Sequence, residues 1–227
     1  MHLPISDKIE LNILHQNSHQ AEKNKVKFNN YNLLCLNIMS SPGAGKTRLL
    51  EITLEDLSKK FHSAVLEGDM TTNLDAARLE KLNIPVVPIT TGRACHLDAN
   101  MVSGGLKLLE KKINPDLLDI LLVENVGNLV CPAEFEIGEH FKVALLSITE
   151  GEDKPLKYPI MFREADLILI TKVDLLPHLN FDINELKSNI ASTNPKADVI
   201  EISSITKSGF DLWQNWISKK ILKFKNK

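Results

Sequence analysis

The chain has 227 residues, of which 43% are hydrophobic, so one domain with a sizeable buried core is expected. Its formal net charge of -2 gives no electrostatic reason to expect a nucleic acid or an anionic membrane as a partner. No apolar run is long enough to cross a bilayer, and the N-terminal region lacks a secretory signal. Three cysteines are too few for a disulfide framework, which favours a cytoplasmic protein whose cysteines are core residues or metal ligands.

The segment Met1–Asn32 is mostly polar and has only a weak apolar face. We expect a short helix followed by a linker, forming an arm on a domain that spans residues 33–227. His15 and His19 lie one helical turn apart, a spacing that suits a metal ion, but a solvated helix face explains them more simply.

From Leu33 onward, near-continuous apolar segments alternate with segments of helical spacing. The predicted strands are Leu33–Met39, Ser63–Gly68, Pro85–Thr90, Leu117–Asn125, Phe141–Thr149, Ala165–Lys172 and Ala197–Ser203. A first helix is predicted after the glycine-containing loop, ending near Lys60, and further helices are predicted over Asn73–Leu82, Asp98–Lys112, Ile183–Ser192 and Gly209–Phe224. The segment Asp98–Lys112 is expected to be helical only in part, because Gly104–Gly105 weaken its middle. This alternation predicts an α/β fold with a mostly parallel sheet flanked by helices, in which ligands bind at the carboxyl ends of the strands.

The segment SSPGAGKT (Ser40–Thr47) follows the first predicted strand and opens a helix. It matches the phosphate-loop consensus G-x-x-x-x-G-K-S/T at Gly45, Lys46 and Thr47, although Ser40 stands in place of the first glycine. In such a loop, backbone amides point at phosphate oxygens, the lysine contacts the β- and γ-phosphates, and the hydroxyl reaches magnesium. The order of strand, loop and helix favours nucleotide binding over an ordinary glycine-rich turn.

The segment TKVD (Thr171–Asp174) ends a later strand, where GTPases carry N-K-x-D. In that motif the aspartate accepts two hydrogen bonds from guanine and the lysine packs along the base, roles that Asp174 and Lys172 fit. Thr171 replaces an asparagine that mostly braces the loop. The serine-rich segment Ser203–Gly209 stands where GTPases place a loop over the base. We therefore expect GTP as the nucleotide, with an ATP-using enzyme as the alternative.

The segment LLVENVG (Leu121–Gly127) resembles a Walker-B strand that ends in a magnesium-binding acid. GTPase switch loops follow with the pattern D-x-x-G, in which the glycine amide senses the γ-phosphate. Glu124 and Gly127 hold that spacing, with glutamate in place of aspartate.

The segment EGDMTTNLD (Glu67–Asp75) adds two further carboxylates, Asp69 and Asp75, as magnesium or switch candidates. Hydrolysis needs a group that positions water or steadies the developing charge, and Asp75 is a candidate for that task. Helix capping by Asn73 or Asp75 is an equally good interpretation.

Two cysteines and a histidine lie in polar loops. Cys95 and His96 are adjacent, and Cys131 follows Gly127 by four residues. Thiolate and imidazole together suit zinc, nickel or copper, whereas Cys35, inside an apolar strand, is a core residue. Three ligands leave a tetrahedral site incomplete, and a dimer could supply the rest by symmetry.

The order of these residues suggests a coupling between the two sites. Glu124, Gly127 and Cys131 lie on one short segment, so a movement of Gly127 on loss of the γ-phosphate would displace Cys131 from a metal shared with Cys95 and His96. Nucleotide state and metal affinity would then depend on each other.

Together these motifs resemble the HypB family, GTPases that insert nickel during maturation of nickel–iron hydrogenase. The resemblance runs from about Leu33 to the C-terminus, and ENVGNLVCP and the Cys-His pair are its most specific parts. It implies a phosphate-loop fold of the SIMIBI class and GTP hydrolysis with dimerisation in the GTP state. It also implies a HypA-type metallochaperone and the hydrogenase large-subunit precursor as partners. Hydrolysis is expected to be slow because the sequence offers no obvious arginine finger.

The resemblance assigns residues by position. It makes Cys95, His96 and Cys131 the nickel or zinc ligands, and Thr47, Asp75 and Glu124 the magnesium ligands. The nucleotide-binding set comprises Gly43, Ala44, Gly45, Lys46, Thr47, Asp69, Gly127, Lys154, Lys172 and Asp174. Lys46, Asp75 and Glu124 would serve hydrolysis.

Two departures limit the analogy. Met1–Asn32 lacks the cysteine motif or histidine-rich stretch of many family members, and Asn100 stands where some carry a further histidine.

The urease accessory GTPase is the nearest rival, but its metal site uses Cys-Pro-His, and this chain has no proline between Cys95 and His96. A GTP-dependent protein switch with structural cysteines is an alternative of another class.

Overall fold

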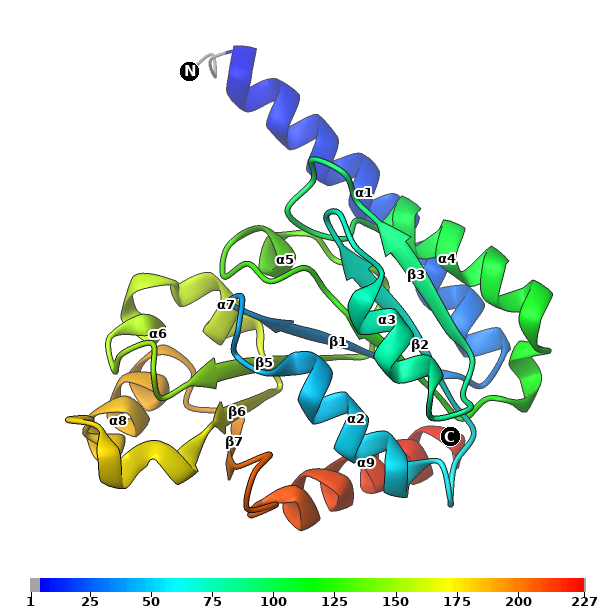
Figure 1. Cartoon of the computed structure of the whole chain (residues 1–227). Helices are drawn as coiled ribbons and strands as arrows, with labels where there is room; N and C mark the ends of the chain where they lie inside the picture. Colours follow the sequence, from blue (N-terminus) through cyan, green and yellow to red (C-terminus); the bar gives the residue numbers. More distant parts are fainter. Residues whose placement is uncertain (1–4, 227) are drawn as a thin grey trace.

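The computed structural model describes residues 5–226, with side chains from Asn12 onward, and contains one seven-stranded parallel sheet. The strand order is β3-β2-β4-β1-β5-β6-β7 (Figure 1). The strands are β1 (Leu34–Ser40), β2 (Ser63–Asp69), β3 (Val86–Thr90), β4 (Ile120–Glu124), β5 (Phe141–Ser147), β6 (Leu167–Thr171) and β7 (Asp198–Ile202). All predicted strands are present, and the predicted fold class is confirmed.

Helices cover both faces of the sheet, because the strands carry apolar side chains on both faces. One face packs against α2 (Lys46–Leu57), α3 (Leu74–Glu80) and α9 (Phe210–Lys225). The other carries α1 (Ile5–Asn30), α4 (Ala99–Lys112), α5 (Cys131–Glu134), α6 (Lys154–Lys157), α7 (Pro159–Glu164) and α8 (Ile183–Thr193). Two 3₁₀ turns span Pro115–Leu117 and Val173–His178. Within β1, Leu36 faces α2 while Cys35 is fully buried on the opposite side, as expected for a core cysteine.

The N-terminal segment differs from its prediction as a short helix and linker. Within the described residues, α1 is one continuous helix of 26 residues whose second half packs against α4, while its first turns project from the body (Figure 1). Buried asparagines make this contact: Asn17 accepts from the Ala99 amide at 2.9 Å, and Asn24 donates to the Ala99 carbonyl at 2.7 Å. Polar anchors give no apolar periodicity, which is why the sequence pattern concealed the length of the helix. His15 and His19 are exposed.

The start of α4 is also fixed by a polar side chain. Asp98 caps the helix by accepting a hydrogen bond from the Met101 amide at 2.7 Å. The helix then runs without interruption through the glycine pair that was expected to weaken it. Cys95 and His96 therefore lie directly before a firmly anchored helix start.

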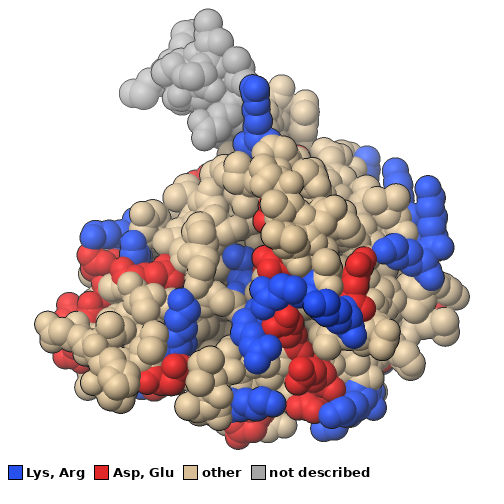
Figure 2. All heavy atoms as spheres, viewed as in Figure 1, with Lys and Arg blue, Asp and Glu red and all other residues tan. Residues whose placement is uncertain are grey.

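Among residues 5–226, none of the helices combines the length and the apolar character that crossing a bilayer demands. Acidic and basic side chains are interleaved over the face seen in Figure 2.

Candidate nucleotide and metal site

A cavity of about 520 Å³ opens where β1, β2 and β4 end. The predicted residues that line it are Gly43, Gly45, Lys46, Thr47, Asp69, Asp75, Glu124 and Gly127. The phosphate loop enters α2 through Gly45, whose φ of 102° is favourable only for glycine. The fold therefore brings predicted residues from three separate segments into one cavity.

Lys46 and Thr47 are both buried and both hydrogen-bonded. The Lys46 ammonium lies 2.9 Å from the Ser40 hydroxyl, so the serine that replaces the first consensus glycine contacts the loop lysine. Burial lowers the pKa of Lys46, and Glu124 opposes this shift. The Thr47 hydroxyl donates to Glu124 Oε1 at 2.7 Å, which joins the loop to the end of β4.

Two buried glutamates face the cavity from neighbouring strands. Glu67 on β2 and Glu124 on β4 are register partners, and each has one carboxylate oxygen without a hydrogen-bond partner. Burial, followed by the Glu124 charge, raises the pKa of Glu67 to about 8, and burial raises that of Glu124 to about 7. Unpartnered buried carboxylate oxygens beside the Thr47 hydroxyl form a donor set that fits a hard divalent cation such as Mg²⁺.

Sequence reasoning assigned no role to Glu67. The EGD motif was recognised, but the position of Glu67 beside Glu124 depends on the register of β2 against β4, which the sequence does not reveal.

Asp69 and Asp75 reach the same cavity from the loop after β2. Asp69 accepts from the Thr71 and Thr72 amides at 2.7 and 3.0 Å, which shapes this loop. Asp75 pairs with Arg78 at 2.9 Å, and neither Asp75 nor Asn73 caps α3 through its side chain. The helix-capping alternative therefore finds no support, and Asp75 remains available to the cavity.

Gly127 lies directly against the phosphate loop. A β-carbon at this position would stand 2.9 Å from Pro42 Cα, so only glycine fits the contact. The phosphate loop therefore touches the segment that continues to Cys131.

The expected base-reading residues gather around the end of β6. The Thr171 hydroxyl donates to the Ala44 carbonyl at 2.8 Å, which ties this strand to the phosphate loop. The Ser203 hydroxyl donates to Asp174, so the loop after β7 contacts the predicted guanine-binding carboxylate. Lys172, Asp174 and Lys154 do not line the phosphate cavity. Lys154 begins α6, with its ammonium 5.4 Å from the centre of the Tyr158 ring.

Cys95 and His96, on the loop after β3, come together with Cys131, the first residue of α5. The two sulfurs are 3.1 Å apart, Cys95 Sγ lies 3.9 Å from His96 Nδ1, and potential ligand atoms of all three residues lie within 4.8 Å of one another. All three side chains are half-buried, and the His96 ring lies against the Phe135 ring. His140 is not part of this group, and its Nδ1 accepts a hydrogen bond from the Cys35 amide at 2.9 Å.

The pKa shifts in this cluster act in opposite directions on the imidazole and on the thiol. Burial lowers the pKa of His96, which keeps the imidazole neutral and able to bind a metal. Burial and the hydrogen bond from Cys95 raise the pKa of Cys131 to about 11. A soft cation could displace the thiol protons, and three ligands within one chain leave a coordination position open.

Comparison with known proteins places this geometry in a family. A model described as the CobW/HypB/UreG nucleotide-binding domain matches residues 34–201. The hydrogenase maturation factor HypB of Escherichia coli K12 is 47% identical over 209 residues, covering 92% of this chain and 71% of that protein. The chain belongs to the HypB family.

Solved structures agree with this assignment. The crystal structure of HypB from Helicobacter pylori in complex with nickel matches with a TM-score of 0.87 and 40% identity, covering 92% of this chain and 96% of that one. FtsY from Mycoplasma mycoides matches with a TM-score of 0.53 and 15% identity over 75% of this chain and 60% of that one, which shows a shared fold only. The HypB-family chain thus has the SIMIBI-type phosphate-loop fold expected from its sequence.

Proposed function

We propose that the protein is a GTP-hydrolysing metallochaperone that delivers nickel to a nickel–iron hydrogenase precursor. The observation that carries the proposal is one segment, Glu124–Cys131, which contributes to both the phosphate cavity and the cysteine–histidine cluster. Membership of the HypB family and the likeness to a HypB crystallised with nickel support it. We place this function in residues 33–227, with Met1–Asn32 as an appended arm and the cytoplasm as the compartment.

The phosphate cavity supports slow GTP hydrolysis. The phosphate-loop amides and Lys46 would hold the β- and γ-phosphates, and Thr47, Glu124 and Asp75 would hold magnesium, with Glu67 added by its register. The cation, when bound, neutralises charge on the phosphate oxygens. Asp75 stands at the cavity wall, where it can orient the attacking water.

Guanine selection would rest on Asp174, whose carboxylate accepts hydrogen bonds from the base. Its position beside Ser203, with Thr171 bracing the phosphate loop, supports this assignment. Lys172 would cover the base, and Lys154 would contact the nucleotide from the same protomer or its partner.

The nickel cargo would bind Cys95, His96 and Cys131, with zinc as a competing ion. A homodimer formed in the GTP state would bring two open coordination spheres together and complete them by symmetry. A HypA-type metallochaperone and the hydrogenase large-subunit precursor are the proposed partners. Urease maturation and a purely protein-directed switch are the alternatives.

Nickel titration tests the proposal. The parent protein, a Cys95→Ala/Cys131→Ala double variant and a Cys35→Ala control are each titrated with Ni²⁺ under reducing conditions, followed by calorimetry. We expect stoichiometric binding to the parent and the control, and loss of that binding in the double variant. Unchanged nickel binding in the double variant would remove the metallochaperone function from this site and favour the protein switch.

A further inference from the structure

The side chain of Asn125 connects two loops that the proposed function requires to move together. Asn125 is fully buried and lies between Glu124 and the switch glycine Gly127. Its Oδ1 accepts hydrogen bonds from the Val126 amide and the Leu97 amide, both at 2.9 Å. One oxygen therefore binds the backbone of the switch loop and the residue that follows His96.

Leu97 is held firmly on its other side as well. Its side chain is fully buried and packs against Gly68, where an added β-carbon would come within 2.7 Å of Leu97 Cδ1. Leu97 is thus fixed between the ends of β2 and β4, the two strands that carry Glu67 and Glu124. The backbone beside His96 is therefore in contact with both strand ends.

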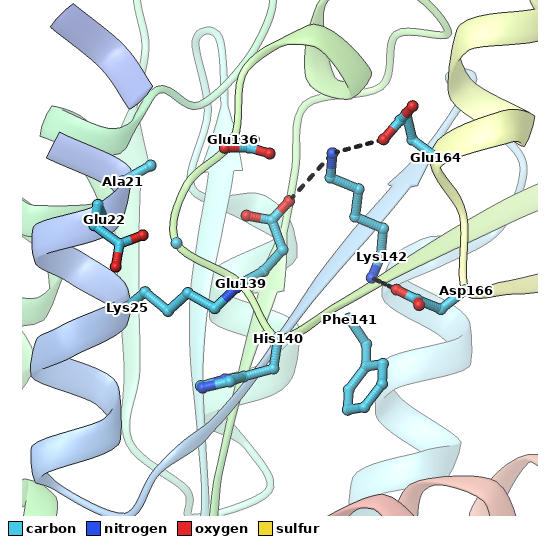
Figure 3. Close-up of a pocket in the computed structure, with 11 residues that line it drawn as sticks. Ala21, Glu22, Lys25, Glu136, Glu139, His140, Phe141, Lys142, Glu164 and Asp166 are labelled. Carbon is cyan, nitrogen blue, oxygen red and sulfur yellow. Dashed lines mark hydrogen bonds and ion pairs between the residues drawn. The ribbon is translucent and has the colours of Figure 1, made fainter. Parts of the chain in front are cut away.

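The orientation of the Asn125 amide is itself determined by a buried polar chain. Its Nδ2 donates to Asn37 Oδ1 at 3.2 Å, and Asn37 donates in turn to Glu139 at 3.3 Å. Glu139 borders a separate cavity of about 220 Å³, where the Lys142 ammonium lies 3.9 Å from it (Figure 3). Because Glu139 can only accept, the Asn37 and Asn125 amides cannot flip, and Oδ1 of Asn125 must face the two backbone amides.

We propose that Asn125 is a positioning residue that transmits movement of the switch loop to the metal ligand His96. When Gly127 shifts with the terminal phosphate, rotation of the Val126 peptide pulls on Asn125 Oδ1 and so on the Leu97 amide. Cys131 moves through the covalent chain and His96 through this hydrogen bond, so two ligands on separate loops respond to one event. This inference rests on the proposed function and adds a second route to its coupling.

An Asn125→Ala variant tests the route, with Asn24→Ala as a matched control. Asn24 is also a buried asparagine, and it holds Ala99, three residues after His96, without touching the switch loop. The Ni²⁺ dissociation constant is measured by chelator competition with GDP and with a non-hydrolysable GTP analogue. We expect the parent and Asn24→Ala to show a ratio between the two states of about fivefold or more. In Asn125→Ala the ratio should fall to about half the parent value or less but stay above unity, because the covalent route through Cys131 remains, while nickel stoichiometry persists.

The outcomes separate this inference from the proposed function. A parent ratio of unity would contradict the coupling itself, whereas an unchanged ratio in Asn125→Ala, or an equal loss in Asn24→Ala, would overturn the role of Asn125 alone. Amide hydrogen exchange on the parent protein needs no variant. The protection of the Leu97 amide should change between the two nucleotide states, while that of Met101, capped by Asp98, should not. Equal protection of Leu97 in both states would also overturn the proposal.

Discussion

The phosphate cavity and the cysteine–histidine cluster lie on the same edge of the sheet but differ in construction. The cavity is bounded by strand ends and a helix N-terminus, and its polar groups Lys46, Glu67 and Glu124 are buried. The cluster draws two ligands from the loop after β3 and one from the start of the four-residue helix α5, and all three remain partly exposed. The core of the fold therefore determines the geometry of the phosphate cavity, whereas the geometry of the cluster depends on the conformation of the segments that follow β3 and β4.

This difference in construction suits the proposed role of the protein as a carrier of a metal ion. A nucleotide site built on a rigid core can bind with constant geometry, whereas an open ligand set can accept and release its ion when the loops move. The contact of Gly127 with Pro42 and the hydrogen bond from Leu97 to Asn125 are two of the places where the elements of the two sites meet.

The largest expected effect comes from removing the phosphate-loop cation. Lys46→Ala should lower kcat for GTP hydrolysis about 1000-fold, because the charge that develops on the transferred phosphoryl group loses its main cation. Phosphate release measures this loss. Nickel affinity without nucleotide should be unchanged, and a parallel loss of nickel binding would contradict the separate construction of the two sites.

A smaller effect is expected at the cluster. Cys131→Ser should weaken nickel binding about 100-fold, since a hydroxyl replaces a soft thiolate, while GTP affinity stays at the parent value. Chelator competition and nucleotide titration measure the two affinities. Cys35→Ser serves as the control for loss of a cysteine outside the cluster, provided that its fold is intact. If GTP affinity falls together with nickel affinity in Cys131→Ser, the loops are part of the rigid site after all.

The base-reading end of the nucleotide site should give a still smaller effect. Asp174→Asn keeps one acceptor and loses one charge-assisted hydrogen bond, so GTP affinity should fall about tenfold while xanthine nucleotides gain. Competition with a fluorescent guanine nucleotide reports both changes. Equal affinity for ATP and GTP in the parent would contradict guanine selection.

The smallest effect concerns the burial of the paired glutamates. Glu67 and Glu124 have pKa values raised to about 8 and 7, so the folded protein retains protons that the unfolded chain, with ordinary values near 4.5, has lost. The free energy of unfolding should therefore fall as pH rises from about 4.5 to 8 and level off above.

Glu67→Gln removes one of these groups. In the presence of EDTA and without nucleotide, its Tm should exceed that of the parent by about 2–6 °C at pH 8.5, and the two should converge near pH 4.5. Thermal unfolding at both pH values measures the difference. A Tm difference independent of pH would exclude a buried charge as its cause.

The motifs that line the phosphate cavity are each contiguous in sequence. SSPGAGKT, EGD and ENVG lie at the ends of strands, and parallel strands bring their carboxyl ends to one edge of the sheet, so a shared cavity could be expected. TKVD also ends a strand, but Lys172 and Asp174 lie outside this cavity. No role was predicted for Glu67, because its position beside Glu124 depends on the register of β2 against β4, two strands that are distant in sequence.

The cluster was anticipated from residue chemistry, but its distances were not. That Cys95 and Cys131 lie 3.1 Å apart depends on loop paths fixed by Thr91, whose amide donates to Asp69, and by Asn125. The long α1 was missed because asparagines such as Asn24 anchor it, and hydrogen bonds between distant segments leave no periodic signal.

Ser40 has a consequence for how an anion would first be recognised. Its hydroxyl accepts a hydrogen bond from the Lys46 ammonium, and Lys46 as a whole is only 9% exposed. The dehydration of this cation is thus accomplished when the chain folds, and an arriving phosphate need not strip water from a flexible side chain. Phosphate binding then replaces the Ser40 oxygen with a phosphate oxygen beside a Lys46 ammonium that is already oriented.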